Sequence, residues 1–368
     1  MADLAIQLPV ILWIAWTFVL GAAVGSLLNV CIARLPLEKS ILWPSSHCGS
    51  CFRPIRWYDN IPLVSYWMLR GRCRNCGATF SIRYFLVELG TGLGFAGLFY
   101  LEIVANIHQL PFFVQQRWNI HNGMAPWQAW AFFGHHAVLL SLLIVAAACD
   151  LNGRVIPLSV TLFGTGVGLL GAICFPWPWP NNVAMPGIMP PAGADWCLVI
   201  PGRGLYPWPV WGPPPDWLPA GGHLMGLATG VTGILVGTWM LRGVRTVFSR
   251  GLGQEALGLG DADLMMMAGA FLGWQPVVVA FFVGALVTLG FAIAQLVINK
   301  DNTLPFGPGL AAGTVITWLC WRWISPPVQV LLFHETLLPV CVGLGAGFMF
   351  ISSALLGALH PRKVEKSV

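Results

Sequence analysis

The chain has 368 residues, of which 57% are hydrophobic and only 9% are charged. An ordinary soluble domain carries roughly 25% charged residues, so this composition excludes a soluble globular enzyme. Apolar runs of about 20 residues recur along the chain, and a helix of about that length is what crosses a bilayer core. The formal net charge of +5 would suit nucleic acid, but the basic residues lie beside the ends of the apolar runs. We therefore predict that the chain contacts a lipid bilayer and does not bind nucleic acid.

Hydropathy predicts nine membrane spans. They cover about 9–31, 84–105, 129–149, 156–175, 222–241, 262–274, 276–298, 308–324 and 336–358. The first span lacks a basic start and a small-residue cleavage site, which is typical of a retained helix rather than a cleaved signal peptide. The short span at 262–274 and the glycine-interrupted one at 308–324 are the weakest. The predicted fold is an all-α polytopic membrane protein with about eight or nine transmembrane helices.

The distribution of Lys and Arg predicts the orientation. If the loop at about 33–83 is cytoplasmic, alternate loops place all Lys and Arg inside except Arg117, Arg203 and Arg322. Because cytoplasmic loops of membrane proteins are enriched in Lys and Arg, the amino terminus should be outside and the carboxyl terminus inside. The positive charge of the chain is thus explained first by its orientation in the membrane.

Two long loops divide the chain into units. We predict a first transmembrane helix at 1–32, a small cytoplasmic loop domain at 33–83 and a polytopic membrane domain at 84–368. The membrane domain carries an outer loop at 176–221 with six Trp and thirteen Pro. Such a loop is not helical, and its tryptophans suit the lipid headgroup layer, with a partner-docking surface as the alternative.

Four cysteines of the cytoplasmic loop form two Cys-x-x-Cys pairs: Cys48 with Cys51, and Cys73 with Cys76. Four thiolates suit tetrahedral zinc, and a closed site of four protein ligands is structural because no position remains for water. A loop of about fifty residues has too small a core to fold alone, so a metal is a sensible stabiliser. The alternatives for these four cysteines are two disulfides or a redox pair, and His47 could compete as a metal ligand. Separately, Cys174 and Cys197 lie near the outer side and are a candidate disulfide pair.

Two aspartates are predicted at the inner membrane face. Asp150 closes the span at 129–149, and Asp261 opens the span at 262–274, so opposite chain directions bring both to one depth. Ionisable groups at that depth are functional candidates. Together they suggest an aspartic protease dyad, in which one carboxyl holds a proton while the other is a base. The alternative is that Asp261 and Asp263 are favourable charges in the first turn of a helix.

The glycines that precede Asp261 add to the dyad hypothesis. Gly258 and Gly260 carry no side chain, so they would let an extended substrate backbone approach the site. In such a site the base takes a proton from water, and the acid donates to the scissile carbonyl or the leaving amine.

In this order and topology, the motifs resemble those of the type IV prepilin peptidases, a family of inner-membrane aspartic proteases with a Gly-x-Gly-Asp motif. The residues that carry the resemblance are Gly25-Ser26-Leu27-Leu28-Asn29-Val30 with Arg34-Leu35-Pro36, the four cysteines, Trp57-Tyr58-Asp59-Asn60-Ile61-Pro62 with Ser65-Tyr66, Arg70-Gly71-Arg72-Cys73, Arg83-Tyr84, Val87-Glu88, Asp150 with Ile156-Pro157, Gly258-Leu259-Gly260-Asp261, and Pro305-Phe306-Gly307-Pro308.

The resemblance implies roles for these residues. Asp150 and Asp261 would be catalytic, and the four cysteines would bind zinc. The protein would lie in a bacterial inner membrane, with a periplasmic amino terminus and its active site at the cytoplasmic face. It would remove the basic leader of type IV prepilins or pseudopilins after a glycine. Members with this loop also methylate the new terminus with S-adenosylmethionine.

Some features depart from the family pattern. Members usually have Lys two places after the second catalytic aspartate, where this chain has Asp263. Successive residues of a helix are rotated by about 100°, so Asp263 points away from Asp261. Asp263 therefore either attracts the basic leader of a substrate or is a solvated helix end. The outer loop and the last span look like additions to the family pattern.

Two other functions are alternatives to the peptidase. A proton-coupled transporter would show internal repeats, which we do not find. The other alternative is an inert assembly factor.

Overall fold

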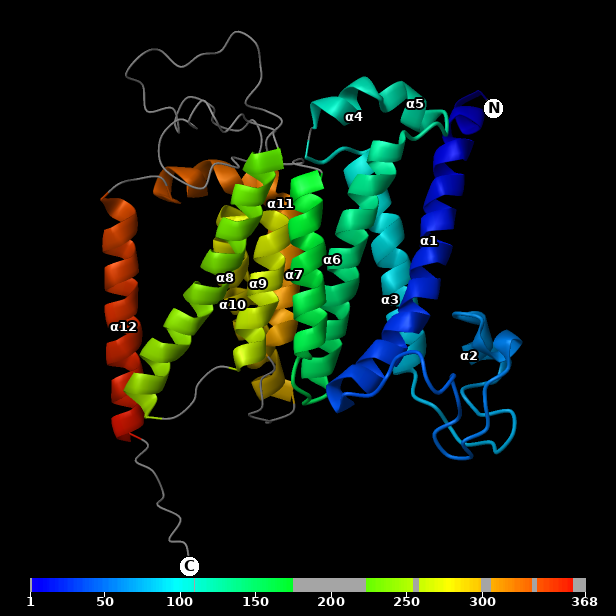
Figure 1. Cartoon of the computed structure of the whole chain (residues 1–368), viewed down its shortest axis with the longest axis horizontal. Coiled ribbons are helices and arrows are strands. Elements are labelled where there is room, and N and C mark those ends of the chain that lie inside the picture. Colours follow the sequence, from blue (N-terminus) through cyan, green and yellow to red (C-terminus); the bar gives the residue numbers. More distant parts are fainter. Residues whose placement is uncertain are drawn as a thin grey trace, which may run out of the picture.

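The computed structural model describes residues 2–108, 110–174, 223–253, 258–298, 306–332 and 336–359. Within these ranges the chain forms a bundle of long helices standing side by side, without a named β-strand (Figure 1). This confirms the predicted all-α class. The outer loop at 176–221 and the pairing of Cys174 with Cys197 lie outside the described residues.

Each predicted span coincides with a helix. The long helices are α1 (Ala2–Arg34), α3 (Arg83–Leu98) with its π-helical continuation η3 (Phe99–Val104), α6 (Trp127–Leu151), α7 (Leu158–Cys174), α8 (His223–Leu252), α9 (Leu259–Leu272), α10 (Trp274–Ile298), α11 (Gly307–Leu332) and α12 (Leu337–Leu359). Six of them are long and apolar enough to cross a membrane: α1, α3 with η3, α6, α8, α10 and α12. Helix α7 is a shorter apolar helix, so the count of nine crossings stays a prediction.

Short helices complete the described fold. They are η1 (Leu35–Leu37), η2 (Trp57–Asn60), α2 (Val64–Met68), α4 (Pro111–Gln115) and α5 (Arg117–His121). Helices α4 and α5 lie at the end of the bundle where α1 begins, and α2 lies at the opposite end, beside α1 and α3 (Figure 1).

Small residues let α1 and α3 pack closely. A Cβ atom added at Gly21 would lie 2.6 Å from the Thr91 carbonyl oxygen, and one added at Gly25 would lie 2.7 Å from the Glu88 Cα. Both distances are too short for any other residue. Small residues four positions apart bring helix backbones together in membranes, so this pair of glycines docks the first helix onto the third.

The short helix α9 lies at the centre of the bundle. Leu264, Met265, Met267 and Ala268 are fully buried, and α9 packs against α7, α8 and α10. Its end is set by Gly273, whose φ of 82° is a conformation that favours glycine. Packing on several sides therefore positions the first turn of α9, which carries Asp261.

A buried polar cluster joins three segments in the half of the bundle away from Asp150. The Glu102 carboxylate of η3 lies 3.3 Å from His108 Nε2 and 3.0 Å from His136 Nδ1 of α6. Trp318 Nε1 of α11 donates to it at 3.0 Å. Glu102 and His136 are fully buried. Because an unpaired carboxylate would be very costly there, this cluster holds α11 against α6 and η3.

Candidate active site and metal centre

The structure brings Asp150 and Asp261 to the same end of the bundle. Asp150 lies in the last turn of α6, and Asp261 lies in the first turn of α9. Asp261 is only 8% exposed. Asp150 lies near enough to act electrostatically on the Asp261 carboxylate. Opposite chain directions therefore bring the two residues to a common end of the bundle.

A third segment completes this site at the start of α11. The backbone N–H of Gly307 donates to Asp150 Oδ2 at 2.7 Å. A Cβ atom on Gly307 would lie 2.8 Å from the same oxygen and 3.1 Å from the Asp150 Cγ. The free N–H groups of a helix amino terminus favour negative charge, so this contact stabilises the ionised form of Asp150.

In the sequence, Gly307 is only one residue of the motif Pro305-Phe306-Gly307-Pro308 that resembles the family. Its contact with Asp150 joins residues 157 positions apart. The available signal was the glycine and proline at the start of an apolar run, which marks a helix start. That signal does not indicate which side chain the new helix meets.

The two glycines of the Gly-x-Gly-Asp motif have different structural roles. A Cβ atom on Gly260 would lie 3.1 Å from the Ile156 Cβ, so Gly260 lets α9 begin close against the α6–α7 connection. Gly258 is the amino-terminal cap residue of α9, and a Cβ atom added there would lie 3.6 Å from Asp261 Oδ2. Asp261 thus lies in the first turn of α9, where a negative charge is favourable.

Asp263 has a partner within the chain. Its Oδ1 lies 3.8 Å from Arg242 Nη2 of α8, and its side chain is 17% exposed. Asp263 is therefore partly shielded from solvent at the start of α9, and the choice between a solvated helix end and a site for the basic leader stays a prediction. At this separation the ion pair contributes little to stability, but it neutralises the charge two residues after Asp261.

The four cysteines of the loop at 33–83 form one cluster. Their sulfur atoms all lie within 4.8 Å of one another, and Cys48 Sγ is 3.8 Å from Cys76 Sγ. A tetrahedral zinc ion with Zn–S bonds of about 2.3 Å requires sulfur atoms about 3.8 Å apart, so the four residues fit that ion. None of the four is disulfide-bonded, so the disulfide alternative is wrong. His47 is not part of the cluster, and its Nδ1 lies 2.9 Å from the Ser45 carbonyl oxygen.

Each cysteine pair lies on the same type of backbone turn. The N–H of Cys48 donates to the Arg53 carbonyl, and the N–H of Cys73 donates to the Ala78 carbonyl five residues further on in the same way. In each turn the residue after the second cysteine has a positive φ, 56° at Phe52 and 71° at Gly77. The two turns are thus a local structural repeat that the sequence reasoning did not find.

The first turn also prepares its thiol for metal binding. Backbone hydrogen bonds from Cys51 and Ser50 lower the pKa of the Cys48 thiol to about 6. The Ser50 nitrogen lies 3.4 Å from Cys48 Sγ. Since the thiolate is the form that binds metals, these backbone donors favour the metal-binding form of Cys48.

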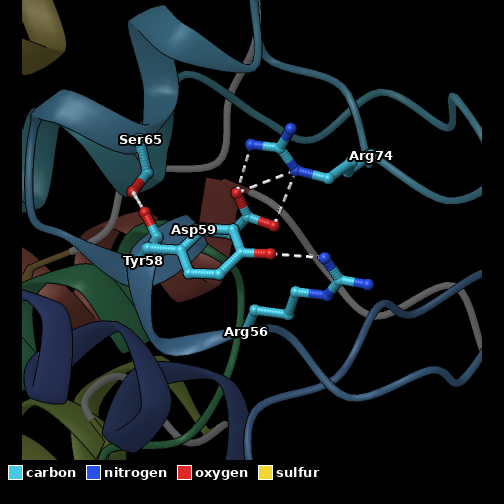
Figure 2. A network of polar contacts seen from close by, with 5 residues as sticks. All are labelled: Arg56, Tyr58, Asp59, Ser65 and Arg74. Carbon is cyan, nitrogen blue, oxygen red and sulfur yellow. Dashed lines mark hydrogen bonds and ion pairs between the residues drawn. The ribbon is translucent and has the colours of Figure 1, made fainter.

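An arginine connects the second turn to the rest of the loop domain (Figure 2). Arg74, between Cys73 and Cys76, forms a forked ion pair with Asp59 of η2, with nitrogen–oxygen distances of 2.6, 2.9 and 3.0 Å. The hydrogen bonds from Arg74 hold the pKa of the Asp59 carboxyl below its usual value. Arg56 donates to the Tyr58 hydroxyl beside this pair. A metal at the cysteine cluster would therefore also order η2.

Comparison with known proteins matches both halves of this architecture. Residues 19–101 match the bacterial peptidase A24 N-terminal domain, and residues 216–293 match the type IV leader peptidase family. A prepilin leader peptidase/N-methyltransferase of Myxococcus xanthus is 31% identical over 90% of this chain and 78% of its own length. The chain belongs to the type IV leader peptidase family.

Other family members give the same result. Proteins of the same name from Klebsiella pneumoniae and Pectobacterium carotovorum are 32% and 30% identical, over 74% and 82% of this chain and 90% and 92% of their own lengths. No solved structure matches the chain. The matched family regions contain the four cysteines and Asp261, whereas Asp150 lies between them. The structure thus supplies independent information on Asp150.

We predict that the cysteine cluster holds one zinc ion per chain. Replacing Cys73 with Ser removes one thiolate, so metal analysis of the purified protein should find a clear loss of zinc and a lower yield of intact protein. The matched control is Cys341→Ser, on an exposed position of α12, which should keep the metal. Full zinc occupancy in the Cys73→Ser, Cys76→Ser double variant would contradict the four-thiolate site.

Proposed function

We propose that this protein is a prepilin leader peptidase and N-methyltransferase. It cleaves the basic leader from type IV prepilins or pseudopilins at the cytoplasmic face of a bacterial inner membrane, and it methylates the new amino terminus with S-adenosylmethionine. Family membership and the names of the relatives support this function. They do not favour the transporter or the inert assembly factor.

The observation that carries the peptidase mechanism is the meeting of Asp150, Asp261 and the Gly307 N–H. Two neighbouring carboxylates do not both ionise readily, so the pair shares one proton. The N–H of Gly307 donates to Asp150, which favours Asp150 as the ionised member. We assign Asp150 as the general base and Asp261 as the protonated acid.

The reaction follows from these assignments. Asp150 accepts a proton from water as the water oxygen bonds to the scissile carbonyl carbon. Asp261 donates its proton to the carbonyl oxygen, which gives a neutral tetrahedral diol. The diol collapses by breaking the C–N bond, with the Asp150 proton passing to the leaving amine and a diol proton returning to Asp261. The dyad ends the cycle in its starting state.

The cysteine cluster has a structural role in this proposal. Cys48, Cys51, Cys73 and Cys76 would hold a zinc ion that leaves no coordination position for water, and the ion would supply folding energy rather than catalysis. Arg74, which lies between two of these cysteines, binds Asp59 and so extends the order of the cluster to η2. The loop domain then has a defined shape without a large apolar core.

Substitution of the aspartates tests the dyad. Asn keeps nearly the shape of Asp and still caps a helix, but it does not accept a proton from water. Asp150→Asn and Asp261→Asn should each abolish leader cleavage while membrane insertion and thermal stability stay almost unchanged. Combining them should cost little more than either alone, because residues that act as a unit lose function together. Cleavage of a purified prepilin, followed by gel electrophoresis and mass spectrometry, is the measurement.

The control is Asp263→Asn, two residues from the proposed acid. Because Asp263 pairs with Arg242, this variant should keep the chemical step. Normal cleavage by Asp261→Asn would overturn the aspartic mechanism. Inactivity confined to Asp263→Asn would show that the wrong member of the acidic pair was assigned.

A second variant tests the contact between α11 and α6. The methyl group of Gly307→Ala would collide with the Asp150 carboxylate and displace it from the N–H donor. Loss of a hydrogen bond to a charged group costs roughly 1.5–3 kcal/mol, so kcat should fall about 10- to 100-fold with little change in KM. Gly134→Ala, which adds a methyl to α6 in open space, should leave both constants unchanged. A raised KM with normal kcat would contradict the assignment.

The proposed orientation places the loop domain in the cytoplasm. A cysteine introduced at Ser46 should therefore react poorly with a membrane-impermeant thiol reagent added to intact cells, and it should react readily after the cells are opened. One introduced at Asn122, in the connection between α5 and α6, should react in intact cells. The opposite pattern would invert the topology and place the dyad at the outer face.

A further inference from the structure

The short helix α2 of the loop domain lies beside a membrane helix rather than in open cytoplasm. The N–H of Leu63, directly before α2, donates to Glu88 Oε2 of α3 at 2.7 Å. The rings of Tyr66 and Trp67 each lie 5.6 Å from the ring of Phe85. These α3 partners belong to the membrane-capable helix that begins at Arg83. Glu88 is about 7.5 Å along that helix, at 1.5 Å per residue, so α2 is level with the first turns of a membrane span.

One face of α2 is apolar and exposed. Val64, Trp67 and Met68 are 47%, 69% and 63% exposed, and their spacing of three and four residues puts them on the same side of a helix. Trp57 of the neighbouring η2 is 81% exposed. On the protein side, Tyr66 packs against Phe80 and Phe85. Helix α2 thus docks on α3 mainly through Tyr66, while most of the Trp67 side chain stays exposed.

Basic residues border this apolar face. Arg56 precedes Trp57, and Arg70 follows Met68 by two residues; both are exposed. Residues 33–82 contain seven Lys and Arg against the acidic pair Glu38 and Asp59, and Asp59 is already paired with Arg74. The surface beside the exposed tryptophans is therefore positively charged and complements anionic lipid headgroups.

We propose that α2 is an interfacial helix that anchors the loop domain in the leaflet where α1 ends. Val64, Trp67 and Met68, with Trp57, lie at the boundary between headgroups and acyl chains, as tryptophans at membrane interfaces do. Arg56 and Arg70 lie among the headgroups and bind anionic phospholipid. Figure 1 shows α2 beside the lower parts of α1 and α3, at the end of the bundle where the rest of the loop lies. The partner of this surface is the lipid bilayer itself.

The test uses the full-length protein in lipid nanodiscs that contain phosphatidylglycerol, with some phospholipid carrying a photoreactive group near the glycerol end of its acyl chain. We expect lipid adducts on Val64, Trp67 or Met68 after illumination. In hydroxyl-radical footprinting read by mass spectrometry, Trp67 and Met68 should be oxidised at least fivefold more slowly than their intrinsic reactivity and exposed fractions predict. Absence of adducts together with unprotected Trp67 and Met68 would overturn the proposal.

Two further arms separate the sources of protection. In nanodiscs of phosphatidylcholine alone, or in the Arg56→Gln, Arg70→Gln double variant, protection should fall; unchanged protection in both would overturn the role of the arginines. Protection that arises only when a prepilin-like peptide is added would identify a substrate surface and overturn lipid docking. Because no arm measures cleavage, the result is independent of the proposed peptidase activity.

Discussion

The proposed dyad depends on one hydrogen bond between the first residue of α11 and the last turn of α6. The Gly307 N–H is a helix-terminal donor without a partner in its own helix, and Asp150 satisfies it at 2.7 Å. The same contact gives the two aspartates different surroundings: Asp150 receives a donor from α11, whereas Asp261 is buried in the first turn of α9. This difference supports the different roles proposed for the two aspartates.

This contact requires α11 to keep its position along α6, and the buried cluster around Glu102 provides that constraint. His136 of α6 and Trp318 of α11 both bind the same carboxylate. His136 precedes Asp150 by fourteen residues, about 21 Å along the helix. The α6–α11 pair is thus fixed by polar contacts at two well separated levels. Hydrogen bonds have this effect in an apolar bundle because apolar side chains alone permit sliding at small cost.

The loop domain achieves its order by other means. Its two matched turns bring four sulfur atoms together, and the Arg74–Asp59 pair extends that order to η2. The hydrogen bond from Leu63 to Glu88 attaches the domain to α3. These few polar links, with the predicted zinc ion and the proposed lipid anchor, would substitute for the hydrophobic core that so short a segment lacks.

The sequence by itself determined the parts of this protein that depend on local pattern. Apolar runs of fixed length indicated the helices, the cysteine spacing indicated the cluster, and chain direction indicated that Asp150 and Asp261 share one end of the bundle. Only the tertiary structure decided the contacts between distant segments: Gly307 with Asp150, Arg242 with Asp263, and Glu102 with its two histidines and Trp318. The reason is physical. Periodicity reports how a residue relates to its own helix, but which side chains meet across helices depends on packing, and a chain of repeated apolar spans offers many pairings of similar pattern.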